Sequence, residues 1–475
     1  MPTSVPTAVS PRSANLILWL VAVGFFMQTL DTTIVNTALP SMAISLGQHP
    51  LQMQSVVIAY ALTMATVIPA SGWLADRFGT RRMFSVAILL FVAGSLACAL
   101  SVRFDQLVAA RVLQGLGGAL LLPVGRLAVL RTFPRERFLR AMSFVAIPGL
   151  VGPLMGPTLG GWLVEVASWH WIFLINVPVG LVGLVLSQRY MPEGPRQRSA
   201  RFDVAGFVLL SAAMVLLSLA LDGLAGFGPG VGQVPALLAL GMASLGGYWL
   251  HAKRRPQPLF PPRLFITDSF RIGLLGNLFA RIGSGAMPFL IPLLLQLGMG
   301  FSPMDAGLMM LPVAIAAILS KRVIPAVVQH FGYRRALVGN TLMLGTLIVL
   351  FSLAAPGQPW WLHLPVLAVF GSVNSIQFTL MNTVTLKDLD ADGASAGNSM
   401  LSMVQMLAMS LGVSVAGALL AVFAQPGAAQ AGVPALAAFQ ATFQWVGFAT
   451  MASAFIFWHL APQDTVASVQ PDAVE

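Results

Sequence analysis

The most informative stretch for predicting the fold is a short loop that reads GWLADRFGTRRM, over residues 72–83, between two long apolar stretches. Its two glycines permit a tight turn from one helix into the next. The carboxylate of Asp76 can meet a helix N-terminus or a nearby arginine, and such a charge pair would latch two helical bundles together on the cytoplasmic side of a membrane. We expect a cytoplasmic gating loop made by Gly72, Asp76, Arg77, Gly79, Arg81 and Arg82.

The composition of the whole chain places this loop in a membrane protein. Of 475 residues, 57% are hydrophobic and only 9% are charged, whereas soluble domains carry about 25% charged residues. The mean hydropathy of +0.82 leaves too little polar surface to cover a soluble protein of this size. The predicted fold class is therefore an all-α integral membrane protein.

A single helix needs about 20 largely apolar residues to cross a bilayer. The first such run, residues 15–38, is too long for a signal-peptide core and lacks a small-residue cleavage site, so we expect it to be retained. We count fourteen candidate spans. They are centred near Met27, Leu62, Phe91, Gln114, Gly152, Val179, Val215, Leu240, Met287, Ala314, Thr346, Gly371, Leu411 and Met451.

The positions of the basic residues set the orientation. With a cytoplasmic N-terminus, all but three of the 26 lysines and arginines fall in segments expected inside, as the positive-inside rule requires. The exceptions are Arg103 in an outer loop and Arg111 and Arg281 within apolar runs. The net charge of +10 therefore indicates topology signals and contacts to anionic lipid, not nucleic-acid binding.

An internal repeat divides the chain. The string RFGTRRM, from Arg77, returns as HFGYRRAL, from His330, 253 residues later. Parallel six-helix halves with helices seven and eight inserted between them explain this spacing. We expect a cytoplasmic stub over 1–14, a first bundle over 15–190, basic linkers with two inserted helices over 191–269, a second bundle over 270–460 and a cytoplasmic tail over 461–475.

The pattern G-x-L-x-D-R-x-G-x-R-R resembles the signature loop of the major facilitator superfamily. Further stretches are similar to motifs of its fourteen-helix drug:proton antiporters: LDTTIVNTALP (30–40), RVLQGLGGA (111–119), GLVGPLMGPTLGG (149–161) and WHWIFLINVPVG (169–180). The likeness covers essentially the whole chain, and KRVIPAVVQHFGYRR and MNTVTLKDL resemble more narrowly the MdtD-type multidrug exporters. Gln329 replaces Asp76 in the second-half loop, so an asymmetric latch is expected.

Three ionisable residues lie at membrane depth, where charges are costly and usually functional. We assign proton coupling to Asp31, with Arg111 as its buried partner; the alternatives are an aspartate that bonds its own helix and an arginine that reaches the interface. Arg281 has no acid at comparable depth in its half, so we assign it to a cationic cavity wall, with a structural ion pair as the alternative.

Small and polar residues supply the remaining candidates. The resemblance implies that helix five controls the exchange between facing states and limits proton leakage through Gly149, Gly152, Pro153, Gly156, Pro157 and Gly160; tight packing alone is the alternative. Polar groups on apolar helices either line a substrate cavity or bond helix to helix. We assign to the cavity Gln28, Asn36, Tyr60, Asn374, Gln377 and Asn382, beside Arg281.

Several classes of protein are disfavoured. The six histidines show no H-E-x-x-H spacing, no G-x-x-x-x-G-K-[ST] loop is present and no Ser/His/Asp set stands out, so we expect neither an enzyme nor ATP coupling. The lone Cys98 cannot form a disulfide within one chain. We expect no cofactor or metal, the proton gradient as energy source, and a monomer.

The leading hypothesis is a proton-coupled exporter of small molecules, multidrug-type, in a bacterial inner membrane with both termini cytoplasmic. An exporter of small organic anions, such as citrate-like carboxylates or their metal chelates, is the alternative that Arg281 favours. A non-transporting membrane scaffold is the alternative of another class. Charged residues at membrane depth, here Asp31, Arg111 and Arg281, are energetically costly, and a scaffold has no use for them.

Overall fold

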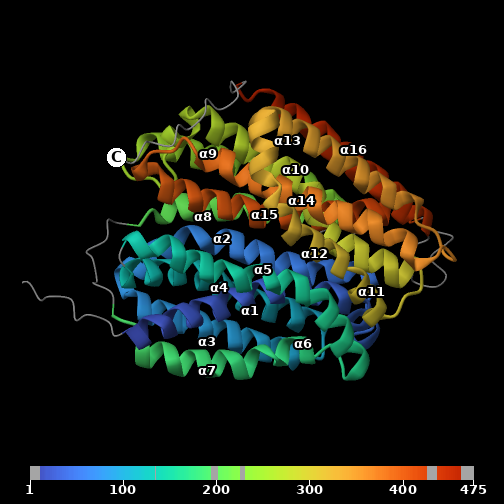
Figure 1. The fold of residues 1–475 in the computed structure, drawn as a ribbon, viewed down its shortest axis with the longest axis horizontal. Helices are drawn as coiled ribbons and strands as arrows, with labels where there is room; N and C mark the ends of the chain where they lie inside the picture. Colours follow the sequence, from blue (N-terminus) through green and yellow to red (C-terminus); the bar gives the residue numbers. More distant parts are fainter. Residues whose placement is uncertain (1–10, 134, 194–201, 225–229, 425–435, 462–475) are drawn as a thin grey trace, which may run out of the picture. The chain divides into compact units, whose positions relative to one another are not determined.

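The computed structural model describes residues 11–133, 135–193, 202–224, 230–424 and 436–461, and in these ranges it contains helices and no β-strand (Figure 1). Three predicted segments lie wholly or mostly outside the described residues. They are the N-terminal stub up to residue 10, the basic linker over 194–201 and the tail beyond residue 461.

The helices before the insertion are α1 (Pro11–Ser45), α2 (Gln54–Phe78), α3 (Thr80–Ala99), α4 (Phe104–Thr132), α5 (Arg135–Val166), α6 (Trp171–Leu174) and α7 (Asn176–Tyr190). The helices in the segment predicted as an insertion are α8 (Val204–Leu224) and α9 (Val234–Arg254). They are followed by α10 (Asp268–Leu293), α11 (Pro303–Met309), α12 (Leu311–Leu319), α13 (Ile324–Leu350), α14 (His363–Leu386), α15 (Ala391–Phe423) and α16 (Leu436–Trp458).

Each of the fourteen predicted span centres lies in a different helix. Among the described residues, eleven helical segments are long and apolar enough to cross a membrane, with α6–α7 and α11–α12 each counted as one broken span. The other three centres lie in α5, α9 and α16, which have 32, 21 and 23 residues. The predicted all-α membrane fold is confirmed.

The sequence repeat produces the same backbone turn twice. Gly79, between α2 and α3, has φ 90°, and Gly332, inside α13, has φ 68°. These are the equivalent glycines of RFGTRRM and HFGYRRAL. A side chain with a Cβ is disfavoured at such φ values, so the repeated glycine is required by the turn itself.

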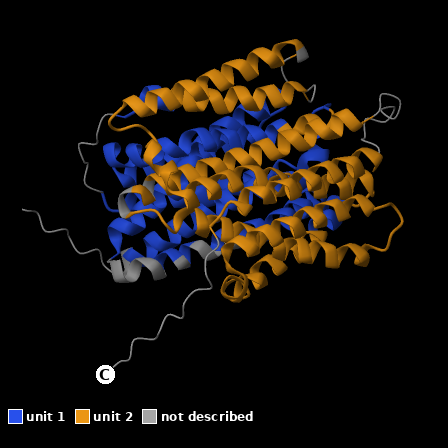
Figure 2. Ribbon diagram, turned by 90° about the horizontal axis from the view of Figure 1, so that it is seen from above, with its two compact units in different colours: residues 1–48, 55–207, 302–307 blue, residues 49–54, 208–301, 308–475 orange. Residues whose placement is uncertain are grey.

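The chain divides into two compact units, coloured separately in Figure 2. Unit 1 comprises residues 1–48, 55–207 and 302–307, and unit 2 comprises residues 49–54, 208–301 and 308–475. Within unit 1, α1 packs on α5, and α3 packs on α4 and α7. Within unit 2, α10 packs on α15, and α13 packs on α14 and α16, so the helix pairs of the repeat are the same in both units.

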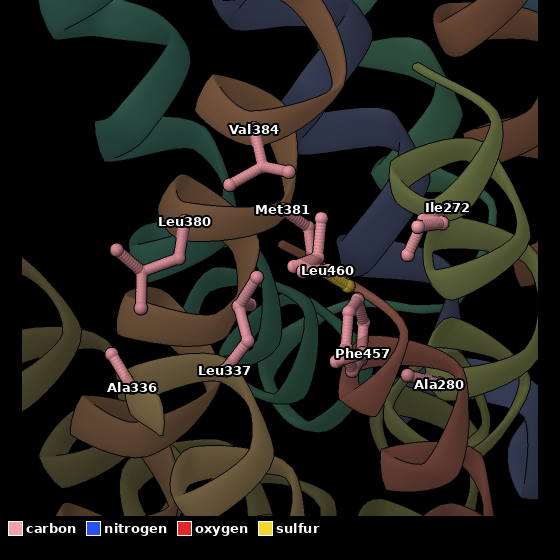
Figure 3. Packing of buried hydrophobic residues seen from close by; sticks show 9 residues of the cluster. All are labelled: Ile272, Ala280, Ala336, Leu337, Leu380, Met381, Val384, Phe457 and Leu460. Carbon is pink, nitrogen blue, oxygen red and sulfur yellow. The ribbon is translucent and has the colours of Figure 1, made fainter. Parts of the chain in front are cut away.

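One apolar core of unit 2 lies where α10, α13, α14 and α16 meet. Figure 3 shows its members, which are Ile272, Ala280, Ala336, Leu337, Leu380, Met381, Val384, Phe457 and Leu460. The ring of Phe457 is fully buried and contacts Gly276, where a Cβ would overlap it. Small residues at such contacts let membrane helices approach and gain packing energy that lipid cannot supply.

Candidate functional site

A buried ion pair joins α1 to α4 within unit 1. The Nη1 atom of Arg111 donates to Oδ2 of Asp31 at 2.6 Å, and the two side chains are 1% and 0% exposed. The predicted pair is therefore present, although its members are 80 positions apart in the sequence. Two charges so far from water are tolerated only when further hydrogen bonds satisfy them.

Two amide side chains supply those bonds. The Nε2 atom of Gln114 donates to Oδ1 of Asp31 at 2.7 Å, and its Oε1 accepts from Nη1 of Arg111 at 2.6 Å. Asn176, the first residue of α7, donates through Nδ2 to the same carboxylate oxygen at 3.3 Å. Charge-assisted bonds of this kind are stronger than bonds between neutral groups, so Asp31 is held by three residues from two other helices.

Sequence reasoning missed two members of this network, Asn176 and Ser95. Asn176 stands in WHWIFLINVPVG as a polar residue among apolar ones, which is the signal that could have found it. Ser95 on α3 accepts from Gln114 at 2.8 Å and contacts Asn176 at 3.5 Å. A serine in an apolar helix does not by itself indicate a functional site, because its hydroxyl can hydrogen-bond to the backbone of its own helix.

The rest of the Arg111 side chain is also engaged. Its Nε donates to the backbone oxygen of Val56 at 3.1 Å. Its guanidinium lies 4.1 Å from the ring centroid of Tyr60 and 5.8 Å from that of Phe173. Planar stacking with simultaneous donation in several directions is possible for arginine and not for lysine, so the site selects this residue type.

This arrangement can exchange one positive partner for another. If a proton binds Asp31, the carboxylate loses its charge and Arg111 is left as an uncompensated buried cation. If Arg111 withdraws, the carboxylate is left as a buried anion. Both states are strongly disfavoured in a dry interior, so a change of partner at Asp31 must be accompanied by movement of α1 and α4 or by entry of water.

The predicted glycine series of α5 packs against the helix that carries Asp31. A Cβ on Gly149, Gly152, Gly156 or Gly160 would overlap, in that order, Phe25, Thr29, Thr33 and Ile34 of α1. Asp31 lies between the levels of Thr29 and Thr33. Pro157 is buried and Pro153 is exposed. The two helices therefore touch almost backbone to backbone beside the ion pair, a geometry that small residues permit.

The gating loop contains a second ion pair. The Oδ1 atom of Asp76 lies 2.6 Å from Nη2 of Arg131 on α4, and Nη1 of Arg131 donates to Thr80 at 2.5 Å. Asp76 thus meets a nearby arginine, as one of the two expected partners, and this arginine belongs to the same unit as Asp76. The carboxylate fixes the α2–α3 turn to the C-terminal end of α4.

The other predicted loop residues lie at the surface of unit 1. Arg81 pairs with Glu193. The guanidinium of Arg77 lies 5.4 Å from the ring centroid of Trp73. Gly72 and Arg82 are exposed, and no atom lies near the place where a Cβ on Gly72 would stand. These positions suit contact with lipid headgroups.

Two predicted cavity residues of unit 2 form helix-to-helix bonds. Gln377 on α14 donates to Thr341 at 2.7 Å and accepts from Asn340 at 2.8 Å, both on α13. Asn382 accepts from Gln405 of α15 at 2.7 Å. These amides therefore connect α13, α14 and α15, and Gln377 in particular is buried with both its polar ends engaged.

Arg281 on α10 has no carboxylate in ion-pair contact among the described residues. Its guanidinium lies 4.5 Å from the ring centroid of Phe378, and the side chain is partly buried. Asn374 lies one helical turn before Phe378 and is also partly buried. An arginine stacked on an aromatic ring keeps donors free to bind an anion.

The predicted cavity residues of α1 differ from those of α14. Gln28 and Asn36 are buried, and their side-chain oxygens have no hydrogen-bond partner among the described residues. Such atoms are available to a donor from a solute or a water. No group of three His, Cys, Asp or Glu side chains in the described ranges is placed to hold a metal ion.

Comparison with known proteins gives consistent matches. A family model described as the Major Facilitator Superfamily matches residues 21–413. A relative from Pectobacterium atrosepticum is 55% identical over 416 residues, which is 88% of this chain and 89% of that protein. One from Escherichia coli O157:H7 is 50% identical over 460 residues, 97% of each. Both carry the name "Putative multidrug resistance protein MdtD".

Solved structures match at the level of the fold. A POT family transporter in complex with 5-aminolevulinic acid superposes with a TM-score of 0.69 and 15% identity, covering 95% of this chain and 97% of that one. The nucleoside transporter NupG superposes with a TM-score of 0.57 and 15% identity, covering 93% and 98%. At this identity the likeness concerns architecture, and substrates do not transfer with it.

Proposed function

This chain belongs to the major facilitator superfamily, and on that premise we propose that it is a proton-coupled antiporter that exports small molecules, of multidrug type, by alternating access. Its relatives are transporters and not enzymes. We place it in the inner membrane of a bacterium with both termini in the cytoplasm, in agreement with the distribution of its basic residues.

The observation that carries this proposal is the Asp31–Arg111 pair, which is buried and hydrogen-bonded by Gln114 and Asn176. A membrane protein that only needed stability would be served as well by apolar side chains. Keeping a carboxylate there is useful if its partner changes during the working cycle. A proton entering from outside takes the place of Arg111 in one facing state, and its release inside restores the pair.

Proton-driven flux in proteoliposomes tests this role. In the Asp31→Asn variant we expect loss of uphill export under an imposed pH gradient, with substrate binding partly retained, because the amide keeps the shape and loses the exchangeable proton. Asp105→Asn is the matched control, since Asp105 is exposed on α4 and pairs with Arg103 at the surface. Uphill export by Asp31→Asn at the wild-type rate would remove Asp31 from coupling.

A second candidate substrate class follows from Arg281. A partly buried guanidinium on an aromatic face, without a carboxylate partner among the described residues, favours small organic anions such as citrate-like carboxylates or their metal chelates. Binding of such an anion would supply the missing negative charge and use the bidentate geometry of the guanidinium.

Replacing Arg281 separates the two substrate classes. We expect Arg281→Ala to lose carboxylate export and to keep export of lipophilic cations. Arg334→Ala is the control, because Arg334 stacks on Trp458 at 4.9 Å in a similar way within the same unit. Equal losses for cationic and anionic solutes would mark Arg281 as structural, and absence of any flux in wild-type vesicles would favour a membrane scaffold.

A further inference from the structure

A second carboxyl group is buried within unit 2, on the first of the two helices predicted as an insertion. Asp222 lies on α8, is 7% exposed, and its Oδ1 has no hydrogen-bond partner among the described residues. Three serine hydroxyls share this state: Ser218 on α8 and Ser410 and Ser414 on α15, all fully buried with Oγ unpaired. Buried polar groups are nearly always satisfied, so these unpaired oxygens on two helices of unit 2 call for an explanation.

Two of these groups, Asp222 and Ser414, come from different helices, α8 and α15. The hydroxyl of Ser414 lies near the Asp222 carboxyl, but its Oγ makes no hydrogen bond to any described residue in this structure. Ser218 precedes Asp222 by one helical turn, and Ser410 precedes Ser414 by one turn. Residues four apart lie on the same face of a helix, so Ser218 shares a face of α8 with Asp222, and Ser410 shares a face of α15 with Ser414. Whether Ser218 and Ser410 are also at the same level depends on whether the two helices run in the same direction.

The contacts around α9 show that the directions agree. Leu209 lies beside Gly247, and Leu217 beside Gly241, so α8 and α9 are antiparallel and α8 begins where α9 ends. The segment after α9, Pro262–Ile266, contacts the start of α15 through Leu264. Both α8 and α15 therefore start at the same end of unit 2, so we expect Ser218 and Ser410 in the layer next to Asp222 and Ser414.

No compensating charge faces Asp222 from these helices. In the described part of α15, ionisable residues are absent from Ala394 to Phe423, and Asp222 is the sole ionisable residue of α8. In α9, His251, Lys253 and Arg254 lie in the last turn, at the opposite end of the antiparallel pair. The sequence AGFGP that follows α8 carries no charge. An ionised carboxylate in such a place would be strongly destabilised.

We propose that Asp222 is a second proton-binding carboxyl of this chain, protonated in the conformation seen here. Its O–H then donates toward the serine hydroxyls, and the cluster becomes a neutral hydrogen-bonded group. The proton leaves when water reaches the carboxyl. This site goes beyond the proposed coupling at Asp31, where Arg111 and two amides stabilise the opposite, ionised form.

Infrared spectroscopy of the purified full-length protein in lipid, without substrate, tests the charge state. At neutral pH we expect a carbonyl band of a protonated carboxylic acid that shifts in heavy water. The band should vanish in Asp222→Asn, move in frequency in Ser414→Ala and remain in Asp31→Asn. A wild-type protein without the band, or an Asp222→Asn protein that keeps it, overturns the proposal.

A chemical test needs no variant and so does not depend on how Asp222→Asn folds. Dicyclohexylcarbodiimide reacts with protonated carboxyl groups in apolar surroundings, and mass spectrometry of the labelled wild-type chain locates the adduct. We expect the adduct on Asp222 and not on Asp31. Labelling of Asp31 in preference to Asp222 would refute the assignment. Both tests work without a transported solute, so they stand apart from the outcome of the export assay.

Discussion

The buried pair predicts a pronounced non-additivity between Asp31 and Arg111. Asp31→Asn leaves a buried guanidinium that still donates to Gln114 and Val56. Arg111→Gln leaves a carboxylate that keeps its bonds from Gln114 and Asn176. Removing one member of a buried pair destabilises by about 3–5 kcal/mol. The double variant leaves no uncompensated charge, so its loss should lie near that of one single variant and well below the sum of both.

The reactivity of a single cysteine beside this network can report its opening. Cys98 is the only cysteine of the chain and is fully buried on α3, with its sulfur 3.7 Å from Oε1 of Gln114. A maleimide dye can therefore react only when the structure around the network opens. Since about 1.4 kcal/mol corresponds to a tenfold change, each single variant should raise the rate of Cys98 labelling roughly 100- to 4,000-fold.

A comparison of the variants tests whether Asp31 and Arg111 are energetically coupled. Labelling rates of the wild type, the two single variants and the double variant give the coupling energy directly. If the double variant labels as fast as the product of the two single effects predicts, Asp31 and Arg111 do not act as a pair. If the single variants label like the wild type, the network does not hold α1 against α4.

The remaining predictions concern helix packing and the gating loop. Gly156→Ala should lower the free energy of unfolding by about 1–3 kcal/mol, because its Cβ would overlap Thr33. Gly246→Ala, at an open helical position on α9, should raise the free energy of unfolding by up to about 1 kcal/mol. Thermal unfolding followed by Cys98 labelling compares the two glycine variants. If both variants change the stability in the same direction, the close approach of α5 to α1 is contradicted. Asp76→Asn should destabilise by about 1 kcal/mol or less, because the pair with Arg131 is partly exposed. The same assay measures it, and a loss as large as that of Asp31→Asn would contradict the difference in burial.

The two membrane carboxyls of this chain occupy opposite surroundings. Asp31 faces a guanidinium and two amide donors, whereas Asp222 lies near the Ser414 hydroxyl and has no ion-pair partner among the described residues. The sequence shows both only as aspartates in apolar runs. It directed attention to Asp31 alone, through its motif, because a pattern of neighbouring residues does not say which side chains arrive from other helices.

Some structural contacts answered questions that the residue pattern left open. The sequence predicted Gln377 and Asn382 as polar groups that either line a cavity or bond helices, and the tertiary contacts place both in bonds between helices. The partner of Asp76 proved to be Arg131, 55 positions away in the same unit. Ser95 entered the network without any local signal.

What the sequence determined by itself is the membrane environment, the spans, the repeat and the glycine turns at Gly79 and Gly332. These follow from hydropathy, charge and backbone sterics, which are properties of neighbouring residues. Only the tertiary structure decided that Asp31, Arg111, Gln114 and Asn176 form one network across 145 positions of sequence. Side chains on separate helices meet according to how the helices rotate and pack, and that is set by contacts along their whole length.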